Sequence, residues 1–152
     1  GIVRDYGLER LEEMLVPSDP IFATPEMHQY LYENYEPLIA EAGAKYDFEK
    51  TGEEGIRNVS RLLYQNKDRE FEEVKEFLIA MAAIYLEIFK NDMGGKIIFK
   101  NGKCLLDETG IGHQDAVYPL ISIVVKWKGY RQNLTDEEDF LVIQYQQLKG
   151  IR

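Results

Sequence analysis

Cysteine and histidine are scarce in this sequence of 152 residues, which contains one cysteine and two histidines. With Cys104 as the only cysteine, neither an intrachain disulfide nor a cluster of thiolate metal ligands can form. His28 and His113 lie far apart in the chain, and neighbouring acidic residues are adjacent rather than spaced as in a calcium loop. We therefore expect no metal site and no cofactor.

Long apolar runs are also missing. The longest nearly uncharged stretch, residues 77–89, is too short to span a bilayer, and the sequence contains no signal peptide. Together with the single cysteine, these absences favour a cytoplasmic protein without a membrane partner. The start of the chain at Gly1 leaves open a leader that has been removed.

Positive charge is in the minority, with 18 basic against 27 acidic side chains and a net charge of -9. Residues 1–94 hold 20 acidic and 10 basic residues, whereas residues 95–152 hold 7 and 8. This charge disfavours contact with nucleic acid or anionic lipid and would attract a basic protein partner. The hydrophobic content of 45% is sufficient for a core, so the length predicts a single domain over residues 1–152.

Apolar spacing predicts three helices before residue 67. The first covers residues 5–15. The second starts after Thr24 as its N-cap, bends or restarts before Pro37 and ends near Gly43. The third starts near Ile56, after a polar stretch.

A longer helix is predicted over residues 68–92, with Asp68 as its cap and the Gly-Gly pair at 94–95 as its end. From Phe77 onward it is apolar on nearly every side, which is typical of a central buried helix. The exception is Glu87, the only charged residue between Phe77 and Phe89.

The part of the chain after this helix contains both kinds of secondary structure. Asn101-Gly102 between two apolar runs predicts a β-hairpin over residues 96–107. Residues 119–130 fit either a strand or a helix, and Pro119 at the start with Gly129 near the end favours the helix. A final helix is predicted with Thr135 as cap and Glu138 completing a capping box. The predicted fold is α+β and mainly helical, with five to six helices around the central helix 68–92 and a small hairpin.

The order of these features over residues 71–148 resembles small bacterial α+β proteins of unknown function, some of which are similar to immunity proteins of toxin systems. The resemblance is carried by Gly94, Gly95, Pro119, Trp127 and the acidic cap at residues 136–140. It implies a shared structural motif and no catalytic residue.

Two sets of residues are candidates for catalysis. Cys104, His113 and Asp115 have the residue types of a nucleophile, a base and an orienting acid, but the sequence does not show that they converge. Glu87 would need a partner or a raised pKa if it were buried, as a functional acid would. The structural interpretations are a core cysteine beside a polar loop, and a glutamate that reaches water or pairs with a lysine.

Aromatic residues near charges are the other candidates. Tyr30, Tyr32 and Tyr35 cluster with Glu33 on the second helix. Tyr30 and Tyr32 lie about 200° apart on a helix, so the tyrosines cannot all face the core, and Tyr32 is expected to be exposed. Exposed tyrosine suits a protein interface, although a wet tyrosine at the core boundary explains the same pattern.

The stretch 126–131, which includes Trp127 and Tyr130, interleaves cations with aromatic rings as single-strand binders do. A helix end with complementary charge accounts for it equally simply, and nucleic-acid binding is not favoured by the net charge. The oligomeric state stays open.

These observations favour a non-catalytic protein-binding domain that contacts a basic protein partner through an acidic helical face containing tyrosines. An inhibitor of the immunity type is the concrete form of this hypothesis. The alternative is a small enzyme that uses Glu87, or Cys104 with His113 and Asp115.

Overall fold

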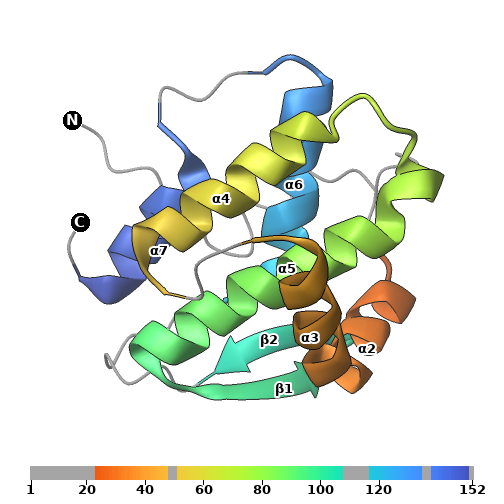
Figure 1. Ribbon diagram of the computed structural model, residues 1–152. Helices are drawn as coiled ribbons and strands as arrows, with labels where there is room; N and C mark the ends of the chain where they lie inside the picture. Colours follow the sequence, from red (N-terminus) through yellow and green to blue (C-terminus); the bar gives the residue numbers. More distant parts are fainter. Residues whose placement is uncertain (1–22, 48–50, 108–116, 135–137, 151–152) are drawn as a thin grey trace.

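The computed structural model of the chain describes residues 23–47, 51–107, 117–134 and 138–150 (Figure 1). The helix expected over residues 5–15 lies outside these ranges. Within them the elements are α2 (Pro25–Glu33), α3 (Tyr35–Lys45), α4 (Gly52–Gln65), α5 (Phe71–Met93), β1 (Lys96–Lys100), β2 (Lys103–Asp107), α6 (Pro119–Arg131) and α7 (Phe140–Lys149). The predicted fold class, α+β and mainly helical with one hairpin, is confirmed.

Helix α5 is the buried axis that the sequence predicts, and α3, α4 and α6 all pack against it (Figure 1). Every residue from Phe77 to Phe89 is buried except Ala80 and Glu87. The predicted cap was wrong, because the helix begins at Phe71 and Glu70 occupies the N-cap position. Asp68 instead lies in the preceding turn and accepts a hydrogen bond of 3.2 Å from the Lys67 ammonium.

Residues 119–131 form a helix, which resolves the ambiguity of this segment in favour of the helical prediction. Helix α6 is buried over its first ten residues because α4, α5, α7 and β2 surround it. The β-branched residues that suggested a strand are therefore explained by a helix that is buried on all sides. The Ser122 hydroxyl lies in this core and donates to the Gln144 side-chain oxygen at 3.0 Å.

The hairpin forms where the Asn-Gly pair predicts it. Asn101 and Gly102 both have positive φ, at 54° and 76°, as a two-residue type I′ turn requires. The strands are antiparallel, with Lys100 opposite Lys103 and Lys96 opposite Asp107. Figure 1 shows the hairpin beside α2, which packs against both strands, and β2 also contacts α6.

The predicted second helix restarts before Pro37, as expected, because it is divided at Asn34 into α2 and α3. Both the backbone and the side chain of Asn34 donate to the Tyr30 carbonyl at 3.0 Å, which closes α2. Pro37 is the third residue of α3, where a missing N–H removes no helical hydrogen bond. Thr24 caps α2 as predicted, since its hydroxyl accepts the Met27 N–H at 3.3 Å.

Three other helix boundaries differ from the prediction. Helix α3 ends at Lys45, two residues beyond Gly43, and α4 begins at Gly52 within the stretch expected to be irregular. Helix α7 begins at Phe140, and its cap is Asp139, whose carboxylate accepts the Leu141 N–H at 3.0 Å. Thr135, the predicted cap, lies outside the described residues.

Candidate functional site

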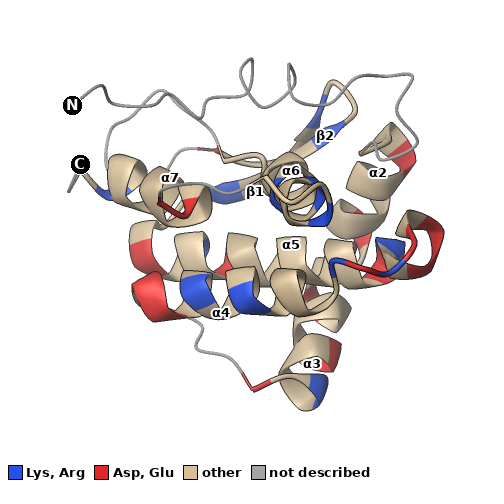
Figure 2. Cartoon of the chain, turned by 90° about the horizontal axis from the view of Figure 1, so that it is seen from above, with Lys and Arg blue, Asp and Glu red and all other residues tan. Residues whose placement is uncertain are grey.

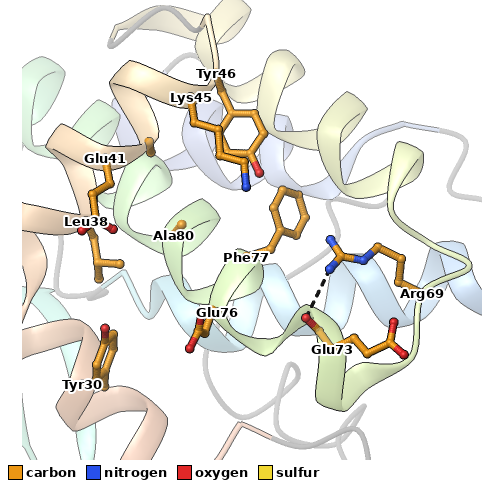
Figure 3. A pocket seen from close by; sticks show the side chains of 11 residues that line it. Tyr30, Leu38, Glu41, Lys45, Tyr46, Arg69, Glu73, Glu76, Phe77 and Ala80 are labelled. Atoms are coloured by element: carbon orange, nitrogen blue, oxygen red, sulfur yellow. Dashed lines mark hydrogen bonds between the residues drawn. The ribbon is translucent and has the colours of Figure 1, made fainter.

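A cavity of about 240 Å³ opens at the surface between α3 and the first half of α5 (Figure 3). Its apolar floor consists of Leu38, Ala42, Phe77 and Ala80, of which the first three are buried. Small residues at positions 42 and 80 leave the space between the two helices unfilled. The cavity therefore follows from the side-chain sizes along this helix contact.

Three exposed glutamates line the cavity, namely Glu41 from α3 and Glu73 and Glu76 from α5. Lys45 and Arg69 lie on the same rim (Figure 3). The Arg69 guanidinium donates to the Glu73 backbone carbonyl at 3.3 Å. Because this hydrogen bond uses the backbone oxygen, it does not engage the exposed Glu73 carboxylate. The site thus combines an apolar floor with a rim in which carboxylates outnumber cations.

Two tyrosines complete the cavity. Tyr30 on α2 is 49% exposed, and Tyr46 packs edge-on against Phe77 with ring centroids 5.9 Å apart. Tyr30 was a predicted binding residue, and the structure places it at the surface. The break at Asn34 lets α3 turn away from the end of α2, so Tyr30 is not covered by α3.

The other predicted binding residues of this region separate into exposed and buried groups. Tyr32 is exposed, as expected, and its ring lies 5.9 Å from that of Phe99. Glu33 is exposed and accepts a hydrogen bond of 2.9 Å from Gln29. Tyr35 is only 7% exposed, because it follows the helix break and turns inward, and it is therefore removed from the predicted binding surface.

Glu87 has a structural partner. The Tyr35 hydroxyl donates to the Glu87 carboxylate, which joins α3 to α5. Burial, with this hydrogen bond as the second cause, raises the pKa of Tyr35 above its ordinary value, so the phenol remains the proton donor. The Lys90 ammonium lies 5.8 Å from the centre of the Tyr35 ring. Glu87 is thus a half-buried acceptor within a helix contact.

Cys104 is fully buried, and burial raises the pKa of its thiol to about 12. At neutral pH the thiol therefore stays protonated and is a weak nucleophile. Its predicted partners, His113 and Asp115, lie outside the described residues. The histidine that the structure places beside it is His28, whose Nδ1 accepts the backbone N–H of Cys104 at 3.1 Å.

His28 has a structural role that the sequence did not indicate. It is 2% exposed, and burial, followed by the charge of Lys103, lowers its pKa to about 4. The imidazole is therefore neutral at pH 7 and fastens α2 to β2. The helical spacing could have predicted its burial, because His28 lies next to Met27 and three residues before Leu31, on the apolar face of α2.

The aromatic and basic residues at the end of α6 are largely engaged in the fold. Trp127 is fully buried, and its indole N–H donates to the Asn66 carbonyl at 2.9 Å, so it too is removed from the predicted binding surface. Lys126 is 5% exposed and forms an ion pair with Asp139 at 3.1 Å. Tyr130 is partly buried and packs edge-on against the exposed Tyr64. The stretch is thus not an open strip for stacking nucleotides.

Within the described ranges no group of three or more histidine, cysteine or acidic residues is placed to hold a metal ion. In the same part of the chain, no helix is both long enough and apolar enough to cross a bilayer. Comparisons with protein-family models, with curated proteins and with solved structures found no match to this chain.

Proposed function

We propose that this chain is a non-catalytic protein-binding domain, which contacts a basic protein partner through the acidic, tyrosine-containing face of α2, α3 and the start of α5. An immunity-type inhibitor that binds a basic toxin is the concrete form of the proposal. The observation that carries it is the cavity between α3 and α5, where exposed carboxylates surround an apolar floor. Figure 2 shows acidic segments on these same three helices.

The electrostatics of this face suit a cationic surface. Glu41, Glu73 and Glu76 come from two helices and line the same hollow, so a Lys or Arg side chain inserted there would lie among acidic residues. The net charge of -9 adds a long-range attraction that raises the association rate. Lys45 and Arg69 on the rim repel a uniformly cationic surface and thereby favour a partner with a defined arrangement of charges.

Tyr30 supplies the contact area that charge alone does not. A half-exposed tyrosine beside a hollow presents a large ring with little conformational entropy to lose on binding. The guanidinium group of an arginine can stack on such a ring while it pairs with the carboxylates. This combination favours arginine over lysine as the central residue of the partner.

The enzymatic alternative has no comparable support. Glu87 accepts a hydrogen bond from Tyr35 within a helix contact, and the Cys104 thiol is buried and protonated. Neither group lines the cavity between α3 and α5.

The test is capture of the partner from cells of the native host with the wild-type protein and two single variants. Glu76→Lys reverses a charge of the cavity, while Glu54→Lys makes the same change in net charge at an exposed position of α4. We expect one stoichiometric basic protein on the wild type and on Glu54→Lys, and its loss on Glu76→Lys. No stoichiometric partner, or equal recovery on all three proteins, would contradict the proposal.

A further inference from the structure

The outer edge of β1 is unpaired among the described residues, since the sheet has two strands in the order β1-β2. In an antiparallel hairpin closed by a two-residue turn, Lys100 and Lys103 exchange both backbone hydrogen bonds, and the bonding then alternates along the ladder. Ile97 and Phe99 therefore direct their N–H and C=O groups away from β2.

The opposite edge of the hairpin confirms this alternation. Leu106, the partner of Ile97, bonds outward to Val117 through both of its backbone groups, at 2.9 and 3.1 Å. Cys104, the partner of Phe99, directs its N–H outward to His28. On the β1 side, the N–H and C=O groups of Ile97 and Phe99 have no hydrogen-bond partner among the described elements. These four groups can therefore form hydrogen bonds with an added strand.

Exposed aromatic rings lie beside this edge. Phe99 is 37% exposed and Tyr32 is 42% exposed, and they contact each other on the face of β1 that looks toward α2. A hollow of about 420 Å³ lies next to them, between Ile97 and the residues around the α2–α3 junction. Side chains of an added strand that face Ile97 and Phe99 would cover these rings and enter the hollow.

The charges along β1 indicate what such a strand must carry. Lys96 and Lys100 are exposed and lie on the same face of β1, four residues apart, with Ile98 between them. Lys96 has Asp107 opposite on β2, whereas Lys100 has Lys103 opposite. An acidic residue on the outer side of β1 would therefore find a cation at both ends of the strand, and opposite charges across a ladder are favourable.

A second copy of the chain does not meet this requirement. Antiparallel pairing of two β1 strands about Ile98 sets Lys96 opposite Lys100 at both ends, and parallel pairing in register sets each lysine opposite itself. Lysines at a sheet edge are a known protection against such self-pairing. The occupant therefore has to differ from β1 in the sign of its charges.

We propose that β1 binds an extended polypeptide segment of a partner as a third strand, with acidic residues at the two positions opposite Lys96 and Lys100 and apolar residues at the three positions between them. Main-chain hydrogen bonds to Ile97 and Phe99 supply the affinity, and the lysine pair selects the sequence. The hollow beside β1 shares no lining residue with the cavity between α3 and α5, and the inference does not depend on the proposed function.

Two fluorescent peptides test the inference by anisotropy with the full chain. One carries Glu-Val-Ile-Val-Glu, and the other replaces both glutamates with lysine. We expect the glutamate peptide to bind at least tenfold more tightly than the lysine peptide. The Lys100→Glu variant, which also places a glutamate opposite Lys103, should weaken the glutamate peptide about fivefold and strengthen the lysine peptide.

Amide exchange measured by NMR identifies the site of binding. The amides of Ile97 and Phe99 should gain protection when the glutamate peptide binds, while that of Ile98, which faces β2, should be protected already. Phe99→Pro removes one outward N–H without removing a hydrogen bond of the hairpin, and should abolish binding. Phe99→Ala keeps that N–H, so it should weaken binding only in part, and the melting temperatures of both variants report whether the hairpin still folds.

Three results would overturn the inference. The first is equal or absent binding of the two peptides, which would mean that the lysines only prevent β1 from pairing with other strands. The second is protection of other amides while those of Ile97 and Phe99 stay unchanged. The third is a dimer in sedimentation that Phe99→Pro dissociates, since the occupant would then be a second copy.

Discussion

Acid should unfold this protein through His28, and the size of the effect can be worked from its surroundings. In the folded state, burial and the charge of Lys103 lower the pKa of His28 to about 4, whereas an exposed histidine has a pKa of about 6.5. Below pH 6.5 the unfolded chain therefore binds a proton that the folded chain rejects. The stabilisation is complete above pH 6.5 and is lost as the pH falls toward 4.

The two pKa values give the expected loss. The free energy of unfolding should fall by about 2 kcal/mol between pH 7.5 and pH 5, and by about 3 kcal/mol at pH 4, through this residue alone. Other groups titrate in the same range, so a second protein is needed as the reference. His28→Gln does not titrate, and its side-chain oxygen can still accept the Cys104 N–H.

The assay is urea unfolding of both proteins at a series of pH values, with the difference in free energy of unfolding plotted against pH. The His28→Gln variant should be the less stable protein at pH 7.5, and its relative stability should rise by about 2 kcal/mol by pH 5. Parallel curves, with a difference that stays constant within about 0.5 kcal/mol over this range, would mean that His28 does not have a lowered pKa in the folded protein.

The remaining predictions concern stability alone. Asp139→Ala removes the carboxylate that caps α7 and pairs with Lys126 at 3.1 Å, so chemical unfolding should show a loss of about 2 to 4 kcal/mol; a loss below about 1 kcal/mol would contradict this assignment. Gly95→Ala should cost at least about 2 kcal/mol, because Gly95 has a φ of 108° and its Cβ would lie 2.8 Å from the Asp107 carbonyl oxygen. Gly43→Ala is the matched change inside α3, where a Cβ meets no atom within 4 Å, and it should instead raise the melting temperature through a gain of about 0.5 to 1 kcal/mol.

The parts of the fold that the sequence predicts well are those governed by local chemistry. Asn101-Gly102 can adopt the positive φ values of a type I′ turn, so the hairpin follows from two residues. Helix α5 carries apolar residues on nearly every side, and such a helix is stable only where other elements cover it on all sides. The Thr24 cap also depends on its neighbours alone.

The parts that it did not predict depend on contacts between distant segments. Asp139 is the cap of α7 because its carboxylate also binds Lys126 and Ser60, from two other helices. Trp127 was a candidate for an exposed aromatic cluster. Only the Asn66 carbonyl, which comes from the distant end of α4, shows that its indole N–H has a hydrogen-bond partner inside the fold.

The candidate site was predicted only in its general nature. Acidic charge and exposed tyrosine on the early helices follow from composition and helical spacing, and Tyr32 and Glu33 are exposed as that spacing indicates. The cavity itself needs Glu41 and Glu76 from helices that are distant in sequence, so no local pattern could reveal it.

The most direct test of the central claim is the salt dependence of the dissociation constant of the captured partner, measured for the wild type, for Glu76→Lys and for Glu54→Lys. The account predicts that rising salt weakens the wild-type complex steeply, that Glu54→Lys shows nearly the same slope, and that Glu76→Lys binds more weakly with a shallower slope. A dissociation constant that is independent of salt, or that is the same for Glu76→Lys as for the wild type, would contradict binding through the acidic cavity.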